Sequence, residues 1–95
     1  MPGPVPIHTA VPAGDTQFII AGSRPERRAI IIFNDSDEYL YLKYVTGIST
    51  DSFTIRVPPQ WYGNMPWGNV YTGILYGMLA ANEVGAFVQV TELVN

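Results

Sequence analysis

The sequence predicts an all-β protein, a small antiparallel β-sandwich or jelly-roll-like barrel with an extended, proline-rich N-terminal arm. Short stretches of β-branched and aromatic residues recur along the chain, and clusters of Gly, Pro, Asn, Asp and Ser separate them. No segment sustains the 3.6-residue period of an amphipathic helix. Because 95 residues bury enough surface for one core only, we expect an arm at residues 1–14 and a single β-sandwich domain at residues 15–95.

The N-terminal arm, residues 1–14, contains four of the eight prolines and two glycines. Proline fixes φ and pushes the preceding residue toward extended geometry, so the segment predicts a polyproline-like conformation. One interpretation is a terminus without fixed structure. The other is an arm whose apolar side chains, Val5, Ile7 and Val11, dock onto a neighbouring subunit.

The first two strands of the domain are expected at residues 16–21 and 28–34. Residues 16–21 are rich in β-formers and end at Gly22, a turn signal. Residues 28–34 are apolar on both faces, which is typical of a central strand rather than an edge strand. Turn-forming residues follow at 35–38, Asp-Ser-Asp-Glu.

The next two strands are expected at residues 39–45 and 53–57. In the first of them Leu40 and Leu42 share one face, which we assign to the core. A polar loop connects it to residues 53–57, where apolar and polar side chains alternate as in a half-buried strand that ends at two prolines.

The C-terminal part of the chain predicts three further strands, at residues 70–75, 76–80 and 86–94. Gly73 and Gly77 mark bulges or bends. In the closing strand, we expect Val88 and Val90 to face the core.

The composition excludes several classes of function. A net charge of −3, with only Arg24, Arg27 and Arg28 close together, provides no basic surface for nucleic acid. Without cysteine there is neither a disulfide framework nor a thiolate metal site. The first residues lack the pattern of a signal peptide, and the longest apolar run, residues 73–81, is too short for a membrane span. We therefore expect a chain that folds in the cytoplasm.

Residues suited to catalysis or metal binding are scarce. The one histidine, His8, lies in the arm, where nothing is expected to hold it rigidly beside a nucleophile. The carboxylates of Asp35, Asp37 and Glu38 are of the type that calcium prefers, but their spacing matches no calcium-binding loop and suits an ordinary turn. We expect no enzymatic activity, no cofactor and no metal.

Residues 58–69 lack a consistent period and predict a structured loop rather than a strand. The aromatic residues of this loop include Trp61, Tyr62 and Trp67. Three interpretations remain open: the rings close the end of the domain's own core, they anchor a subunit interface, or they stack on a sugar whose hydroxyls bind the amides of Gln60 and Asn64.

The basic cluster of Arg24, Arg27 and Arg28 precedes the apolar strand at 28–34. It reads either as a solvated strand entry or as a set of guanidinium groups that pair with an acidic patch on a partner.

A sequence of short motifs runs through residues 24–93. In chain order they are Arg27-Arg28, Ile30 to Asn34, Asp35 to Asp37, Tyr39 to Tyr44, Thr46 to Ser52, Pro58 to Trp67, Tyr71-Thr72-Gly73-Ile74 and Val90-Thr91-Glu92. This order resembles that of small bacteriophage virion proteins of the head decoration (cement) or head-fibre type.

The resemblance implies a β-sandwich displayed in many copies on a capsid, with trimers favoured and no catalytic residues to transfer. The expected function is that of a capsid decoration protein, made in the host cytoplasm, that binds the major capsid protein on the outer surface of the virion and stabilises the mature head. The alternatives are a carbohydrate-binding or adsorption accessory domain that binds a glycan through Trp61, Tyr62 and Trp67, or a neck or tail component. The residues expected at interfaces are Val5, Ile7, Val11, Arg24, Arg27, Arg28, Trp61, Tyr62 and Trp67.

Overall fold

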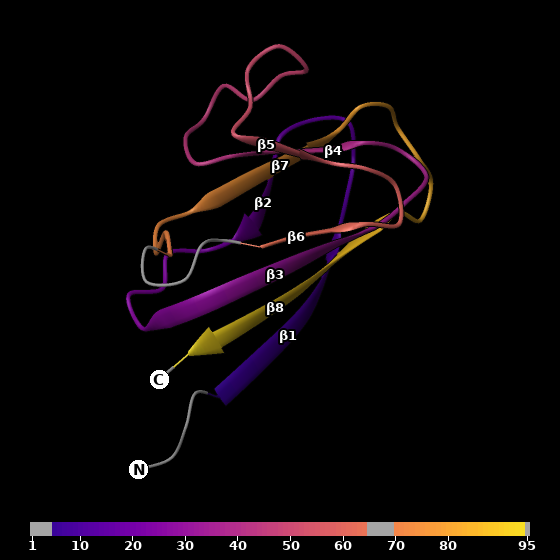
Figure 1. Cartoon of the computed structure of the whole chain (residues 1–95). Helices are drawn as coiled ribbons and strands as arrows, with labels where there is room; N and C mark the ends of the chain where they lie inside the picture. The colour runs from indigo at the N-terminus through magenta and orange to yellow at the C-terminus, as the bar shows by residue number, and fades with distance from the viewer. Residues whose placement is uncertain (1–4, 65–69, 95) are drawn as a thin grey trace.

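The structure, a computed structural model, describes residues 5–64 and 70–94 (Figure 1). These residues form the strands β1 (Val5–Pro12), β2 (Phe18–Ala21), β3 (Arg27–Asp35), β4 (Leu40–Lys43), β5 (Ile55–Val57), β6 (Tyr62–Asn64), β7 (Leu75–Leu79) and β8 (Phe87–Val94). Within the described ranges there is no helix long and apolar enough to cross a membrane.

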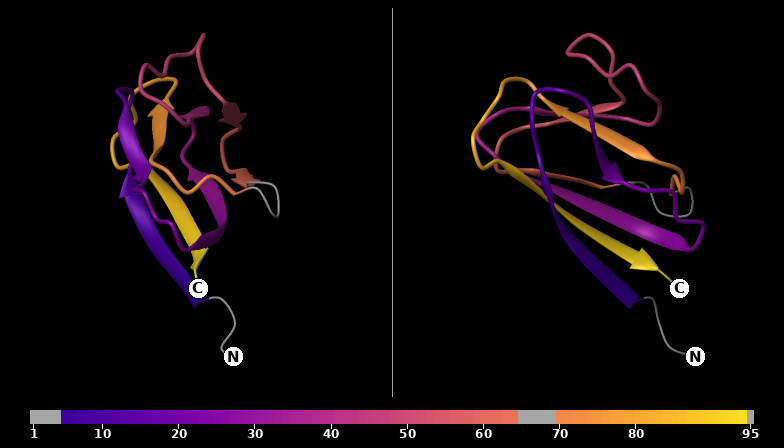
Figure 2. Two further views of the ribbon diagram at one scale, coloured as in Figure 1. Left: turned by 90° about the vertical axis from the view of Figure 1, so that its left-hand side faces the viewer. Right: turned by 180° about the vertical axis from the view of Figure 1, so that it is seen from behind.

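The strands form two antiparallel four-stranded sheets. The first has the order β1-β8-β3-β6 and the second the order β2-β7-β4-β5. Figures 1 and 2 show β1, β8 and β3 side by side in one layer, with β7, β4 and β5 in the other. Together the layers enclose the core between them, as in a sandwich.

The pairing follows a simple rule: β1 pairs with β8, β2 with β7, β3 with β6 and β4 with β5. The chain is therefore one long hairpin that has been rolled up, and this is the arrangement of an eight-stranded jelly roll. The predicted all-β, antiparallel sandwich or jelly-roll-like fold is confirmed.

Most of the N-terminal arm predicted at residues 1–14 forms strand β1. It is extended, and it pairs with β8 along its whole length, from Val5 opposite Val94 to Pro12 opposite Phe87. It lies at the edge of the first sheet, where proline is tolerated because one side of the strand makes no ladder hydrogen bonds. The division of the chain into an arm and a separate domain stays a prediction.

The core is built from alternate residues of both sheets. Ile30 and Ile32 of β3 are buried, and β3 is central, between β8 and β6. The other buried apolar residues that meet in this cluster include Leu40, Leu42, Val57, Leu75, Leu79, Val88 and Val90. The inward orientation predicted for Leu40, Leu42, Val88 and Val90 is confirmed.

Two strand predictions were wrong. The loop predicted at residues 58–69 contains β6, whose three residues are too few to show a period. The strand predicted at 70–75 is absent from the described residues before β7, and β7 is a single strand. The carbonyl groups of Tyr71 and Gly73 instead accept hydrogen bonds from the Arg27 guanidinium, at 2.8 and 3.2 Å.

Gly77 is required by packing rather than by a bulge. It pairs regularly with Phe18 and Leu42, and a Cβ atom placed there would lie 2.5 Å from Cδ1 of the buried Ile20. Gly77→Ala is therefore expected to lower the free energy of unfolding by about 1–3 kcal/mol through overpacking, measured by urea denaturation. Gly22→Ala is the control, since its Cβ would meet nothing within 4 Å. Equal stability of the two variants would contradict this account.

Candidate functional site

The outer surface of the first sheet carries aromatic and aliphatic side chains. Because Ile32 faces the core, its neighbours Ile31 and Phe33 face outward. Phe33 lies opposite Tyr62 of β6, so their side chains share this surface, and Phe87 lies at the start of β8 on the same side. We call Ile31, Phe33, Trp61, Tyr62 and Phe87 the outer aromatic face.

This face is exposed and almost uncharged. Ile31, Tyr62 and Phe87 are 46%, 55% and 40% exposed. The formal charges nearby are at its two ends, on the exposed Arg28 and Asp35. The polar residues Thr91 and Gln89 of β8 lie opposite Ile31 and Phe33 on the same side of the sheet. Exposed aromatic and aliphatic side chains that gather on one surface mark an interaction site more often than solvent-facing structure.

Trp61 and Tyr62 form a stacked pair at one side of the outer aromatic face. Their ring centroids are 5.7 Å apart and the ring planes differ by 21°. Both side chains are more than half exposed, so neither belongs to the core of the described domain. Trp67, the third predicted aromatic, lies outside the described residues.

A buried asparagine holds this aromatic pair in place. The Asn34 side chain is fully buried, and its Nδ2 donates to the carbonyl groups of Glu38, Val57 and Pro58 at 2.7, 3.1 and 3.1 Å. Its main-chain N–H donates to the carbonyl of Trp61 at 2.8 Å. One residue therefore ties the turn after β3 to the segment that presents the rings.

Gln60, which directly precedes Trp61, has a left-handed backbone conformation. Its φ is +55°, in a turn closed by a hydrogen bond from the N–H of Trp61 to the carbonyl of Pro58. A side chain in that region costs about 1–2 kcal/mol, which must be offset elsewhere. Here the Gln60 amide donates to the carbonyl of Ser36 at 3.1 Å. The strained turn fixes the direction in which Trp61 leaves the sheet.

The basic cluster lies at the other end of β3, and one of its three residues, Arg27, is internal. The Arg27 guanidinium is buried and donates to Glu92 Oε2 at 2.7 Å and to the carbonyl of Gly22 at 2.6 Å, in addition to the two carbonyls described above. Arg24 Nε reaches the same oxygen of Glu92 at 3.1 Å. Arg27 thus closes the end of the sandwich from within, while Arg24 is half-buried and Arg28 is exposed.

The predicted interface residues of the arm lie on β1. Val5 is exposed, whereas Ile7 and Val11 are half-buried, and Val11 packs against the core. His8 is held by β8 rather than being free: its Nε2 donates to Gln89 Oε1 at 2.8 Å, and Nδ1 lies 3.0 Å from Thr91 Oγ1. These placements leave the interface prediction for β1 untested.

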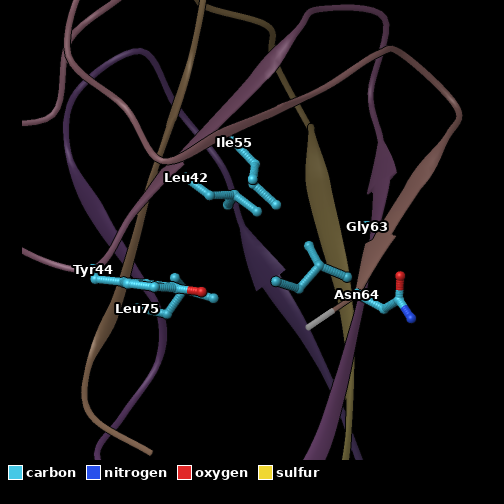
Figure 3. Close-up of a pocket in the computed structure, with 7 residues that line it drawn as sticks. Leu42, Tyr44, Ile55, Gly63, Asn64 and Leu75 are labelled. Carbon is cyan, nitrogen blue, oxygen red and sulfur yellow. The ribbon is translucent and has the colours of Figure 1, made fainter. Parts of the chain in front are cut away.

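A cavity of about 230 Å³ lies between the sheets, beside β5 and β6 (Figure 3). Its lining residues are Ile32, Leu42, Tyr44, Ile55, Gly63, Asn64 and Leu75. The walls are apolar, and the Asn64 amide points away from the aliphatic side chains. Such a lining offers packing contacts and no acid–base pair.

The acidic turn serves the fold. The main-chain N–H of Asp37 donates to Glu83 Oε1 at 2.8 Å, which joins the turn after β3 to the turn before β8. In the described part of the chain, no three acidic or histidine side chains are grouped as a metal site requires.

Comparison with protein-family models, with curated proteins and with solved structures found no match to this chain.

Proposed function

We propose that the chain is a structural protein of a bacteriophage virion, a capsid decoration protein that binds the major capsid protein on the outer surface of the head and stabilises it. The observation that carries this proposal is the outer aromatic face, a nearly uncharged surface with exposed rings, whose main-chain segment at Pro58 and Trp61 is held by hydrogen bonds from Asn34. Buried aromatic residues contribute most of the binding energy in protein interfaces.

The fold is compatible with this role. Jelly rolls occur in viral capsid domains and also in lectins, and a shared fold does not imply a shared function. Support for the proposed function comes from the outer aromatic face and from the order of motifs along residues 24–93, which resembles that of head decoration proteins.

A decoration role makes physical sense for a domain of this size. A protein that binds an assembled lattice, and not the separated subunits, stabilises the lattice by mass action. Contacts repeated between neighbouring copies raise the effective concentration further, so each single contact can be weak.

The double replacement Trp61→Ala/Tyr62→Ala is expected to weaken binding to particles that lack this protein. Loss of two interface aromatics costs about 2 kcal/mol or more, equivalent to a dissociation constant raised roughly 30-fold. Co-sedimentation with such particles measures the effect. Both side chains are exposed, so the free energy of unfolding should change little.

Tyr39→Ala is the matched control, because Tyr39 is a 40% exposed aromatic that adjoins the second sheet and contacts Arg56 there. It is expected to leave binding unchanged. If the double variant bound as tightly as the unchanged protein, the outer aromatic face would not be the docking surface.

A further inference from the structure

Strand β1 occupies a special place in the rolled hairpin. Among the described strands it pairs with β8 alone, whereas β8 also pairs with β3. Because β1 is the open end of the hairpin, it can leave without breaking any of the other strand pairs. The rest of the first sheet would keep its register.

Few side-chain contacts hold β1 in place. None of its eight residues is buried, whereas β8 has four buried residues. Among the described residues, the side-chain contacts of β1 include the two His8 contacts with β8 and the packing of the half-buried Val11 against the core, and Ile7 is also half-buried. The strand is therefore held mainly by backbone hydrogen bonds, which any identical β8 can supply.

The prolines of β1 keep it extended when it is released. The N–H of Ala13 donates to the carbonyl of Ala86 on the β8 side, so N–H groups of odd-numbered residues point toward β8. Pro6 and Pro12 lie at even positions, where the missing N–H costs no ladder bond. Since proline also holds an unpaired chain near extended geometry, less conformational entropy is lost when the strand pairs again.

The connection from β1 to β2 can span between molecules. Residues 13–17 cross from the first sheet to the second, and an added Cβ atom at Gly14 would meet nothing within 4 Å. The carbonyl of Gly14 accepts a hydrogen bond from the N–H of Leu79 at 2.8 Å, and exchange of β1 would have to break this bond. Beyond it the chain is fixed at Gln17, whose Oε1 accepts hydrogen bonds from the N–H groups of Gly47 and Ile48. In a fully extended conformation, the five residues 13–17 span about 17 Å, which is the distance available between the two molecules.

We propose that β1 is an exchangeable strand, which pairs with β8 of a second copy of this chain. Every hydrogen bond of the ladder is the same in either arrangement, so the local concentration of neighbouring copies decides which one forms. The inference rests on the proposed function in one respect: a capsid lattice would supply neighbours at a fixed short distance.

The chain has no cysteine, which allows a clean test with single-cysteine variants. Ala10 lies opposite Gln89 on the outer side of the sheet. Their Cα atoms form a non-hydrogen-bonded pair about 4.5 Å apart, which is within the range of a disulfide. Ala10→Cys and Gln89→Cys proteins are mixed at high concentration, oxidised, and analysed by intact mass spectrometry under non-reducing conditions.

Exchange predicts a disulfide between the two different chains. Ala10→Cys mixed with Val84→Cys gives the background from random collision, because Val84 is 96% exposed and lies outside the strands. We expect the Ala10→Cys and Gln89→Cys mixture to exceed that background roughly tenfold. Equal yields would overturn the exchange. The copy number of the protein on virions is measured in a separate experiment. If that copy number is high and the mixture gives no disulfide yield above the background, the exchange is refuted and the proposed function is retained.

Discussion

Arg27→Met is expected to destabilise the domain by about 3–5 kcal/mol, because it leaves the buried Glu92 carboxylate with only the partly exposed Arg24 as its partner. Arg27 is 2% exposed and Glu92 is 5% exposed, and the two side chains form the ion pair at the start of β3. The variant also removes the donors that satisfy the carbonyl groups of Gly22, Tyr71 and Gly73. Urea denaturation followed by tryptophan fluorescence measures the loss.

Arg24→Met is the matched control for this prediction. Arg24 contacts the same oxygen of Glu92, but its side chain is 35% exposed, so its removal is expected to cost less than about 1 kcal/mol. The double variant Arg27→Met/Glu92→Leu is expected to recover part of the stability lost by Arg27→Met, since no unpaired charge remains buried. Similar losses for Arg24→Met and Arg27→Met would contradict the assignment of Arg27 as the internal residue.

Asn34→Ala is expected to destabilise the domain by about 3 kcal/mol and to disorder the aromatic pair. Its side chain satisfies three carbonyl groups and accepts a hydrogen bond from Ser36 Oγ at 2.6 Å, and buried polar groups left without partners cost about 1–3 kcal/mol each when they cannot reach water. The stability change is measured by denaturation, and the second effect by increased quenching of tryptophan fluorescence.

The variant Asn34→Asp tests the amide donor alone, because aspartate has nearly the same size as asparagine but places an acceptor oxygen against the carbonyl oxygens. It is expected to be at least as destabilising as Asn34→Ala. Asn82→Asp is the control at an exposed turn position, where a change within about 0.5 kcal/mol is expected. A stable Asn34→Asp variant would show that the amide donor is dispensable.

The parts of the fold that depend on neighbouring residues could be predicted from the sequence. The apolar run of β3, the turn after it and the alternating leucines of β4 all have local causes, because side chains alternate along a strand and Asp and Ser favour turns. Strand β6 had no such signal. It exists because β3 offers it an edge, and Gly63 leaves room beside Val57, where a Cβ would lie at 3.3 Å.

The residues that build the candidate site depend on distant partners. From the sequence, Arg27 is predicted to be solvated or at an interface, because its partner Glu92 lies 65 positions away and no local pattern indicates the pairing. Asn34 reads as an ordinary residue at the end of a strand, yet it binds the carbonyl of Val57, 23 positions away. By contrast, the exposure of Trp61 and Tyr62 does not fit the interpretation that these two rings close the domain's own core, and the interface and sugar interpretations stay predictions.

The most direct test of the proposed function is the copy number of this protein, relative to the major capsid protein, in purified particles from its source, measured by quantitative mass spectrometry. Decoration of a lattice predicts one copy per coat subunit or a simple fraction of that number, since each copy binds a repeated site. A handful of copies per particle, as in a neck or tail component, or complete absence from the particles, would contradict the proposed function.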